Sequence, residues 1–108
     1  MKTGDIIIVS FPFTDQINFK ARPAVLVTQT TDYDDIIVCL ISSVVPQKIK
    51  PLYLFLDPEK SNGLRKKSVL KIDRIATIEK AKVVAVIGKL NKEELSYFKE
   101  KFKSLVDS

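Results

Sequence analysis

Cationic and hydroxyl side chains in this sequence gather beside the short apolar runs and in the segments between them. Strand ends and loops are where binding groups usually lie, and cations there could hold a polyanion such as nucleic acid. Phe11, Phe13, Phe19 and Tyr53 are nearby aromatic side chains that could stack on bases. The alternative is that the charges form an ordinary solvated surface. The polar residues concerned are Lys20, Arg22, Ser42, Ser43, Lys48, Lys50, Arg65, Lys66, Lys67, Lys71, Asp73 and Arg74.

The residue types present exclude several kinds of catalysis. The chain contains no histidine, so a Ser-His-Asp triad and a histidine-rich zinc site are impossible. The one cysteine, Cys39, stands inside the apolar run IIVCLI and is expected to be a small buried residue. The acidic segment TTDYDD lacks the glycine and the distant glutamate of a calcium loop, so we interpret it as a solvated turn. No Gly-rich phosphate loop or paired CxxC occurs, and we expect no metal and no cofactor.

The composition predicts one globular domain with a preference for anions. The chain has 108 residues, of which 45% are hydrophobic and 29% charged, and we expect a single domain over residues 1–108. The formal net charge of +5 favours a polyanionic partner. No apolar run approaches the roughly 20 residues that span a bilayer, and the N-terminal segment lacks the cleavage site of a signal peptide. We therefore expect a cytoplasmic protein with no membrane partner.

The apolar runs predict several short strands followed by one helix. β-Branched and other apolar residues fill each run, and turn-forming segments separate the runs. In segment 91–106 the period changes to 3.6 residues, and Asn91 and Glu94 have the spacing of a helix-capping box. Short strands at close spacing with one terminal helix suggest a small, strongly curved antiparallel sheet or a partly closed barrel. The predicted strands are 5–11, 23–29, 36–43, 52–56, 68–73 and 82–88.

Two of these strands carry specific expectations about polar residues. Pro23 opens its run, and proline is tolerated at the first residue of a strand, so Arg22 is expected just outside that strand. Lys71 and Asp73 are two residues apart in SVLKID, so alternation puts both side chains on one face. These two charges could serve one site, or they could form a surface ion pair of little energetic value.

Three segments in fixed order resemble a known family. They are GDIIIVSFPFTD followed by RPAVLV, then LISS at the end of the third predicted strand, then GLRKKSVLKIDRIATIEK followed by IGKL and the closing helix. Together they resemble the MazF/PemK/Kid toxins of type II toxin–antitoxin systems over nearly the whole chain. The resemblance implies a mainly β, SH3-like barrel of the plasmid-maintenance-toxin type with a C-terminal helix. It also implies a homodimer and a cognate acidic antitoxin.

The resemblance further implies a metal-independent endoribonuclease, an mRNA interferase that cuts single-stranded RNA at short sequences. In this family the 2′-hydroxyl of the RNA attacks the adjacent phosphate, which leaves a 2′,3′-cyclic phosphate and a 5′-hydroxyl end. The protein must then align the phosphate, spread the developing negative charge and help two protons move. Because the nucleophile belongs to the RNA, the absence of an activated serine or cysteine is no obstacle.

The motifs of the family also imply roles for particular residues. The central arginine of the family corresponds to Arg22, whose planar guanidinium can grip a phosphate with two donors. The threonine after the third strand corresponds to Ser42, which could donate to a non-bridging oxygen, with Ser43 taking its place if the register slips. A cation and a carboxylate of the Kid branch correspond to Lys71 as charge stabiliser and Asp73 as candidate base. The predicted RNA-binding residues are Phe19, Lys20, Ser43, Lys48, Lys50, Arg65, Lys67 and Arg74.

The sequence departs from the family between Phe11 and Arg22. There TDQINFK replaces the Glu-Gln pair of many MazF loops, and the Kid-type histidine is absent, so the cleavage sequence and the proton shuttle stay open. Two functions of other classes fit the same fold: a non-catalytic DNA gyrase inhibitor like CcdB, and a basic nucleic-acid-binding barrel without catalysis. The set Arg22, Ser42 and Asp73 favours the nuclease, because docking to a protein has no evident use for it.

Overall fold

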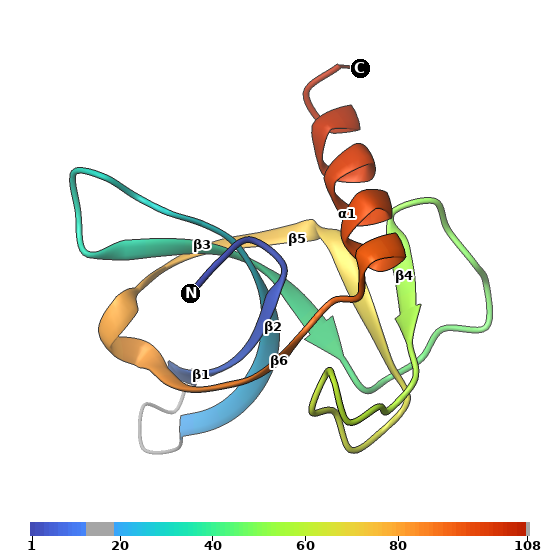
Figure 1. Ribbon diagram of the computed structural model, residues 1–108, viewed down its shortest axis with the longest axis horizontal. Helices are drawn as coiled ribbons and strands as arrows, with labels where there is room; N and C mark the ends of the chain where they lie inside the picture. Colours follow the sequence, from blue (N-terminus) through green and yellow to red (C-terminus); the bar gives the residue numbers. More distant parts are fainter. Residues whose placement is uncertain (13–18, 108) are drawn as a thin grey trace.

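Six strands and one α-helix form the described part of the chain, which is residues 1–12 and 19–107 of the computed structural model (Figure 1). The strands make one antiparallel sheet in the order β4-β5-β3-β2-β1-β6. The predicted mainly β fold with a C-terminal helix is confirmed, and all strands except β2 and β5 begin and end within one residue of their predicted bounds. The elements are β1 (Asp5–Pro12), β2 (Phe19–Gln29), β3 (Asp35–Ser42), β4 (Tyr53–Leu56), β5 (Ser68–Glu79), the 3₁₀ turn η1 (Lys80–Lys82), β6 (Val83–Lys89) and α1 (Lys92–Ser104).

Apolar side chains cover both faces of this sheet. Ile6 and Ile7 are adjacent in β1 and both are fully buried, but they belong to different core clusters because successive side chains of a strand point to opposite faces. One cluster includes Phe98 of α1, and the other is formed by residues of β1, β2 and β3, with residues of β5 and β6 packed against it. Figure 1 shows the sheet curling on itself. Burial on both faces explains why the run IIIV, residues 6–9, is continuously apolar and does not alternate with polar residues.

Helix α1 begins at the capping box that the sequence predicts. The side-chain oxygen of Asn91 accepts a hydrogen bond from the Glu94 N–H at 2.8 Å, and Glu94 Oε1 accepts one from the Asn91 N–H at 2.8 Å. Phe98 is 1% exposed, and the hydroxyl of Tyr97 donates to the carbonyl of Pro51 at 2.6 Å, so the helix is tied both to the core and to the β3–β4 loop. Within the described residues, no helix combines the length and the apolar surface that a membrane span requires.

The start of β2 differs from the prediction. The strand begins at Phe19, and Pro23 lies inside it, opposite Ile8 of β1. Pairing with β3 begins only at Ala24, so the N–H that proline lacks is not needed in that ladder. Arg22 is therefore part of a strand and is not outside it, which gives its backbone a more rigid position than a loop would.

Strand β5 also differs from the prediction, because it runs well beyond its predicted end and contains a large bulge. Its pairing with β3 jumps from the Ile41–Leu70 pair to the Cys39–Ile75 pair, so residues 71–74 stand opposite a single residue of β3. Bulges bend a strand and redirect its side chains, and Figure 1 shows β5 changing direction sharply beside α1. The segment LKIDR is thus a bend within a continuous strand and does not mark the end of the strand.

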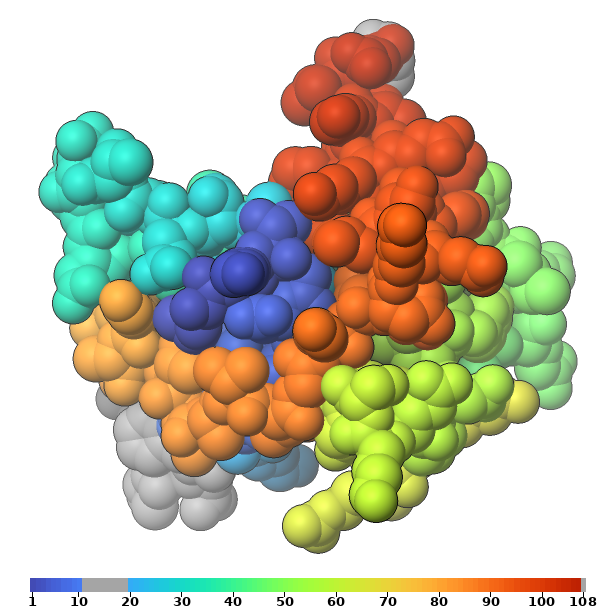
Figure 2. Space-filling view, in the orientation of Figure 1, coloured from blue at the N-terminus to red at the C-terminus, as the bar shows by residue number. Residues whose placement is uncertain are grey.

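The loop between β4 and β5, residues 57–67, packs its backbone against β6. Gly63 in this loop has φ of +71°, a conformation that glycine adopts without a steric penalty. Gly88 of β6 lies so close to the carbonyl of Ser61 that a side chain there would overlap it, and the neighbouring Lys89 N–H donates to that carbonyl at 3.0 Å. In Figure 2 the yellow-green loop lies directly against the orange segment that includes β6. The loop is therefore held against the sheet.

Gly88→Ala is expected to lower the free energy of unfolding by about 1–3 kcal/mol. The added methyl group would lie 2.6 Å from the Cα atom of Asn62 and would force the loop away from β6. Urea denaturation followed by circular dichroism measures the change. Ala85→Val adds apolar volume at an exposed position of the same strand and serves as the control, with an expected change within about 0.5 kcal/mol. Wild-type stability of Gly88→Ala would show that the close approach does not matter.

Candidate nucleic-acid interface

Arg22 and Ser42 lie just beyond the paired part of the β2–β3 ladder, on one face of the sheet. The ladder ends at the Ala24–Leu40 pair, and Arg22 and Ser42 are each two residues past that pair on their own strands. Because side chains alternate between the two faces of a strand, Arg22 shares the face of Ala24, and Ser42 shares the face of Leu40. Arg22 is exposed and Ser42 is half-buried, so solvent can reach both side chains.

The turn after β3 orients the hydroxyl of Ser42. Its Oγ accepts a hydrogen bond from the Val44 N–H at 3.1 Å. The donor side of the hydroxyl makes a long contact of 3.5 Å with the Val44 carbonyl, which is at the limit of a hydrogen bond. The O–H can therefore turn towards a stronger acceptor, such as a phosphate oxygen, without losing a strong interaction.

The sheet face that carries Ser42 continues into β5 and β4. Ser42 pairs with Val69 of β5, and Lys71 follows two residues later on the same face. Lys71 pairs with Tyr53 of β4, and its Nζ lies 5.8 Å from the centroid of the Tyr53 ring. The residues Arg22, Ser42, Lys71 and Tyr53 thus lie on one face of four neighbouring strands, and we call this set the cross-strand row.

The bulge of β5 is anchored at its centre by Ile72. This side chain is fully buried, its N–H donates to the Leu52 carbonyl at 2.8 Å, and its carbonyl accepts a hydrogen bond from the Cys39 thiol at 3.3 Å. Because Ile72 faces the core, its two neighbours Lys71 and Asp73 are directed away from the core. That these two side chains lie on the same side of the strand stays a prediction, because alternation is disturbed within a bulge.

Asp73 lines a groove of about 500 Å³ between the bulge and α1. Lys50 and Tyr53 line the same groove, and Lys50 Nζ lies 5.6 Å from the centroid of the Tyr53 ring. Two cations, Lys50 and Lys71, therefore flank one aromatic ring next to an exposed carboxylate. Lys71 and Asp73 do not form the surface ion pair that the sequence allowed, because Lys71 lies over Tyr53.

A second groove, of about 620 Å³, lies at the ends of β2 and β3 and is called here the loop groove. Alternation puts its β2 residues on the opposite side of the strand from Arg22. The loop groove and the cross-strand row therefore lie on opposite sides of β2, near the same end of the strand. Its lining includes Ala21, Pro23, Ser43, Arg65 and Lys66.

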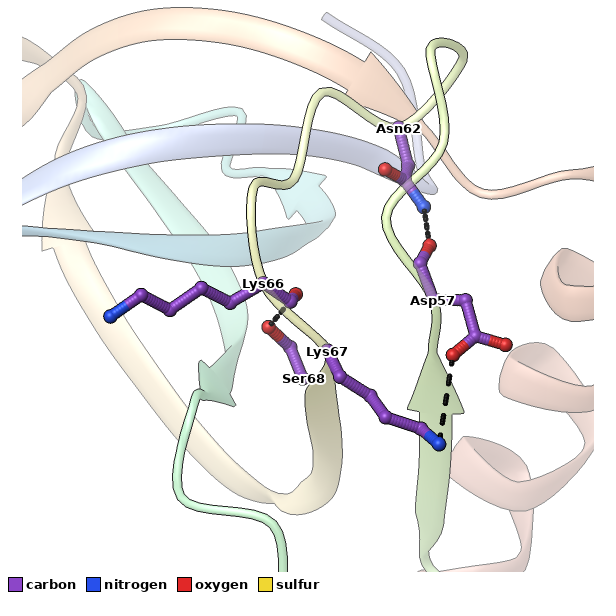
Figure 3. Close-up of polar contacts among 5 residues, drawn as sticks. All are labelled: Asp57, Asn62, Lys66, Lys67 and Ser68. Atoms are coloured by element: carbon purple, nitrogen blue, oxygen red, sulfur yellow. Dashed lines mark hydrogen bonds and ion pairs between the residues drawn. The ribbon is translucent and has the colours of Figure 1, made fainter.

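The basic segment RKK before β5 divides its side chains between two environments. Arg65 lines the loop groove, as does Lys66, which was not among the predicted RNA-binding residues. Lys67, which was predicted, instead forms an ion pair with Asp57 at 3.9 Å (Figure 3). No sequence signal separates the two lysines, because the direction of each side chain depends on contacts of the folded loop.

The other predicted RNA-binding residues are more widely spread. Lys20 is exposed and precedes Arg22 by two residues in β2, and Arg74 is exposed on the β5 bulge. Lys48 is exposed in the β3–β4 loop and is not among the residues that line either groove. Phe19 starts β2, but its side chain lies outside the described part of the chain, as do residues 13–18. The structure thus brings together only part of the predicted set.

The acidic segment between β2 and β3 is an exposed turn, as the sequence predicts. Asp32 and Asp34 are exposed, and the Thr30 hydroxyl donates to the Tyr33 carbonyl at 2.8 Å and closes the turn. Over residues 1–12 and 19–107, no three acidic, thiol or imidazole side chains gather closely enough to hold a metal ion.

Cys39 is a buried core residue, as predicted. Its exposed fraction is 0%, and its thiol donates to the Ile72 carbonyl. Burial, and to a smaller degree the negative charge of Asp73, raise the pKa of the Cys39 thiol from 9.0 to about 12. The thiol is therefore protonated at neutral pH, and the nucleophilic form is almost absent.

The thiol of Cys39 is expected to react with iodoacetamide at pH 8 at least about a thousandfold more slowly in the native protein than in urea, because the pKa difference is about three units (12 − 9.0). Mass spectrometry of quenched samples measures both rates. Since the native pKa is the raised one, the stability that this group contributes is complete below pH 9 and is lost as the pH rises towards 12. Equal rates in buffer and in urea would contradict the buried position.

A curled antiparallel sheet closed by one helix, with cationic grooves at its strand ends, defines a small barrel-like domain suited to a polyanionic ligand. The sequence narrows this class further. Residues 2–106 match the family described as PemK-like, MazF-like toxin of type II toxin-antitoxin system, so the chain belongs to that family. This match confirms the resemblance of the sequence motifs to the MazF/PemK/Kid toxins.

Several solved structures share this fold. The Mycobacterium tuberculosis toxin MazF-mt6 is 24% identical over 95% of this chain and 96% of its own, with a TM-score of 0.73. The MazE-MazF structure from Deinococcus radiodurans reaches a TM-score of 0.78 at 13% identity, over 99% of this chain and 96% of that one. A mycobacterial endoribonuclease in complex with its cognate antitoxin has a TM-score of 0.73 at 11% identity, over 99% and 95% of the two chains. No curated protein matched the chain.

Proposed function

We propose that this toxin is a sequence-selective endoribonuclease that cleaves single-stranded RNA without a metal ion. The observation that carries the proposal is the register of the sheet, which supports a site where Arg22 and Ser42 share the face that also carries Lys71. Membership of the PemK-like, MazF-like family supports it, and one protein of the same fold is an endoribonuclease.

In the proposed reaction Arg22 and Ser42 hold the scissile phosphate. The guanidinium presents parallel donors to the non-bridging oxygens and stays charged throughout the physiological pH range. The hydroxyl of Ser42 donates to a non-bridging oxygen and gives up its long contact with the Val44 carbonyl. Both interactions become stronger as negative charge grows on the phosphorane, and this differential binding lowers the barrier.

The nucleophile is the 2′-hydroxyl of the RNA. The O2′–P bond forms as the P–O5′ bond breaks, so the products are a 2′,3′-cyclic phosphate and a 5′-hydroxyl end. Asp73 accepts the proton of the 2′-hydroxyl, Lys71 stabilises the negative charge, and the departing O5′ takes a proton from water. The position of Asp73 beside Tyr53 and Lys50 supports this assignment, since a base stacked on Tyr53 would bring its ribose to that groove.

The partners that we propose are single-stranded RNA, a second copy of the chain and an acidic antitoxin. The net charge of +5 is complementary to an acidic protein. Two proteins of the same fold occur with an antitoxin, the mycobacterial endoribonuclease and the Deinococcus radiodurans MazE-MazF pair. An antitoxin that covered the cationic grooves would block RNA from the cross-strand row. We also propose that the toxin acts in the cytoplasm, because that is where such an RNA substrate would be met.

Purified protein incubated with mixed RNA in EDTA is expected to produce fragments with 5′-hydroxyl ends. Arg22→Ala should lower the cleavage rate by about a hundredfold or more, because it removes the main stabiliser of transition-state charge. Ser42→Ala should lower the rate by about tenfold, the cost of one hydrogen bond to a charged oxygen. Mapping of the fragment ends and single-turnover rates measure both effects.

Lys92→Ala is the matched control for these variants, since it removes one exposed cation from the first turn of α1 and should cleave at the wild-type rate. Fragments with 5′-phosphate ends, or cleavage that requires added metal, would contradict the mechanism. RNA that is bound but left intact would favour the non-catalytic barrel. Intact RNA together with stalled DNA gyrase would favour the gyrase inhibitor.

A further inference from the structure

Asn62 is a buried polar residue that the proposed chemistry does not use. Its side chain is 2% exposed and bonds to the backbone of its own loop. Oδ1 accepts hydrogen bonds from the Glu59 N–H at 3.0 Å and the Leu64 N–H at 2.9 Å, and Nδ2 donates to the Asp57 carbonyl at 2.8 Å. One amide group therefore fixes the loop at three backbone positions.

The cationic segment 65–67 is consequently held at both of its ends. On the N-terminal side it follows directly from the residues that Asn62 binds. On the C-terminal side Ser68, which is 4% exposed, donates its hydroxyl to the Lys66 carbonyl at 2.9 Å. Ordering a free backbone on binding costs conformational entropy, and a segment that is already ordered avoids this cost.

The two lysines of this segment point in different directions (Figure 3). Lys67 reaches Asp57, whereas Lys66 extends away from that pair on the other side of the loop. Lys66 and Arg65 line the loop groove. The fixed backbone thus directs two of its three cations into a groove.

The loop groove adjoins the point where the proposed reaction takes place. Ala21 and Pro23 line it and are the chain neighbours of Arg22, and Ser43 lines it and follows Ser42. An RNA strand with its scissile phosphate held by Arg22 and Ser42 would reach the loop groove if a neighbouring part of its backbone turned around the end of β2.

We infer that Asn62 is a positioning residue for RNA binding. Its three backbone hydrogen bonds hold Arg65 and Lys66 along the loop groove, where the two cations contact phosphates beyond the scissile one. This inference rests on the proposed function, because the ligand is the same RNA strand. It assigns the loop 57–67 to substrate affinity, and it leaves the chemical step to the cross-strand row and Asp73.

Binding is tested with a fluorescent, mixed-sequence RNA in which every 2′-hydroxyl is methylated, so that cleavage is impossible. Lys66→Gln is expected to weaken binding about fivefold and to reduce the salt dependence of log affinity by about 0.7, the value for one phosphate contact on a single strand. Lys60→Gln removes the same charge from another exposed position of the loop and should leave the slope unchanged. Equal losses in both variants would overturn the assignment of Lys66.

The role of Asn62 is tested by combining it with Lys66. Asn62→Ala should raise KM for cleavable RNA about fivefold while kcat stays within about twofold of wild type. In that background Lys66→Gln should have little further effect, because the lysine is no longer held at the groove. Asn62→Asp keeps oxygen acceptors for the Glu59 and Leu64 N–H groups, so Lys66→Gln should still weaken binding about fivefold there. If the effects of Asn62→Ala and Lys66→Gln on binding are additive, the positioning role is overturned. If Asn62→Ala does not fold, the test uses Asn62→Asp instead: the positioning role is overturned if Lys66→Gln no longer weakens binding in the folded Asn62→Asp protein.

Failure of the inference and failure of the proposed function give different results. If wild-type protein binds the methylated RNA through Lys66 but cleaves no RNA, the inference stands and the nuclease proposal fails. If cleavage depends on Arg22 but Lys66→Gln binds as wild type does, the nuclease proposal stands and the inference fails. Absence of RNA binding by wild-type protein would overturn both.

Discussion

A single sheet that buries apolar side chains on both of its faces is the constraint on which the rest of this structure depends. Ile6 and Ile7 are adjacent and both fully buried, so the middle of a strand has little room for polar groups. Curling closes one face, and α1 closes the other. Ser42 at the end of β3, the β3–β4 and β4–β5 loops and the β5 bulge accordingly supply most residues of the proposed site, and Arg22 joins them from the part of β2 that has no β3 partner.

The site is assembled by strand register and not by closeness in the sequence. Arg22 and Ser42 are separated by a whole hairpin, yet they share a face because the β2–β3 ladder is held in place by buried residues such as Val25 and Cys39. A shift of one residue in that ladder would put the two side chains on opposite faces. Buried residues also fix the β5 bulge, since the side chain of Ile72 is held in the core and leaves Lys71 and Asp73 outside it. Core packing and the geometry of the site are thus set by the same contacts.

Local signals predicted the elements well, and long-range contacts account for most of what they missed. The capping residues at Asn91 are a short-range pattern, and the helix begins where they indicate. Pro23 was a misleading signal, because a proline can lie inside a strand where one neighbouring ladder has not yet begun. The bulge of β5 depends on which residues of β3 it pairs with, and a single sequence does not contain that information. The sequence predicted Lys67 as a binding residue, but in the structure Lys66 lines the groove and Lys67 pairs with Asp57, because the contacts of the folded loop decide which way each side chain points. The position of Lys71 over the ring of Tyr53 likewise depends on the pairing of β4 with β5.

The close contact between the 57–67 loop and β6 determines which residues of the loop can be substituted without loss of the fold. The backbone of the loop is fixed by Asn62, Gly63 and Gly88, and none of these interactions involves the side chains of residues 65 and 66. Substitutions at these two positions can therefore alter the surface offered to a ligand while the fold stays the same. The loop is a natural place for divergence in evolution, and it is also a place where a library of variants could be screened for altered ligand preference at little risk to folding.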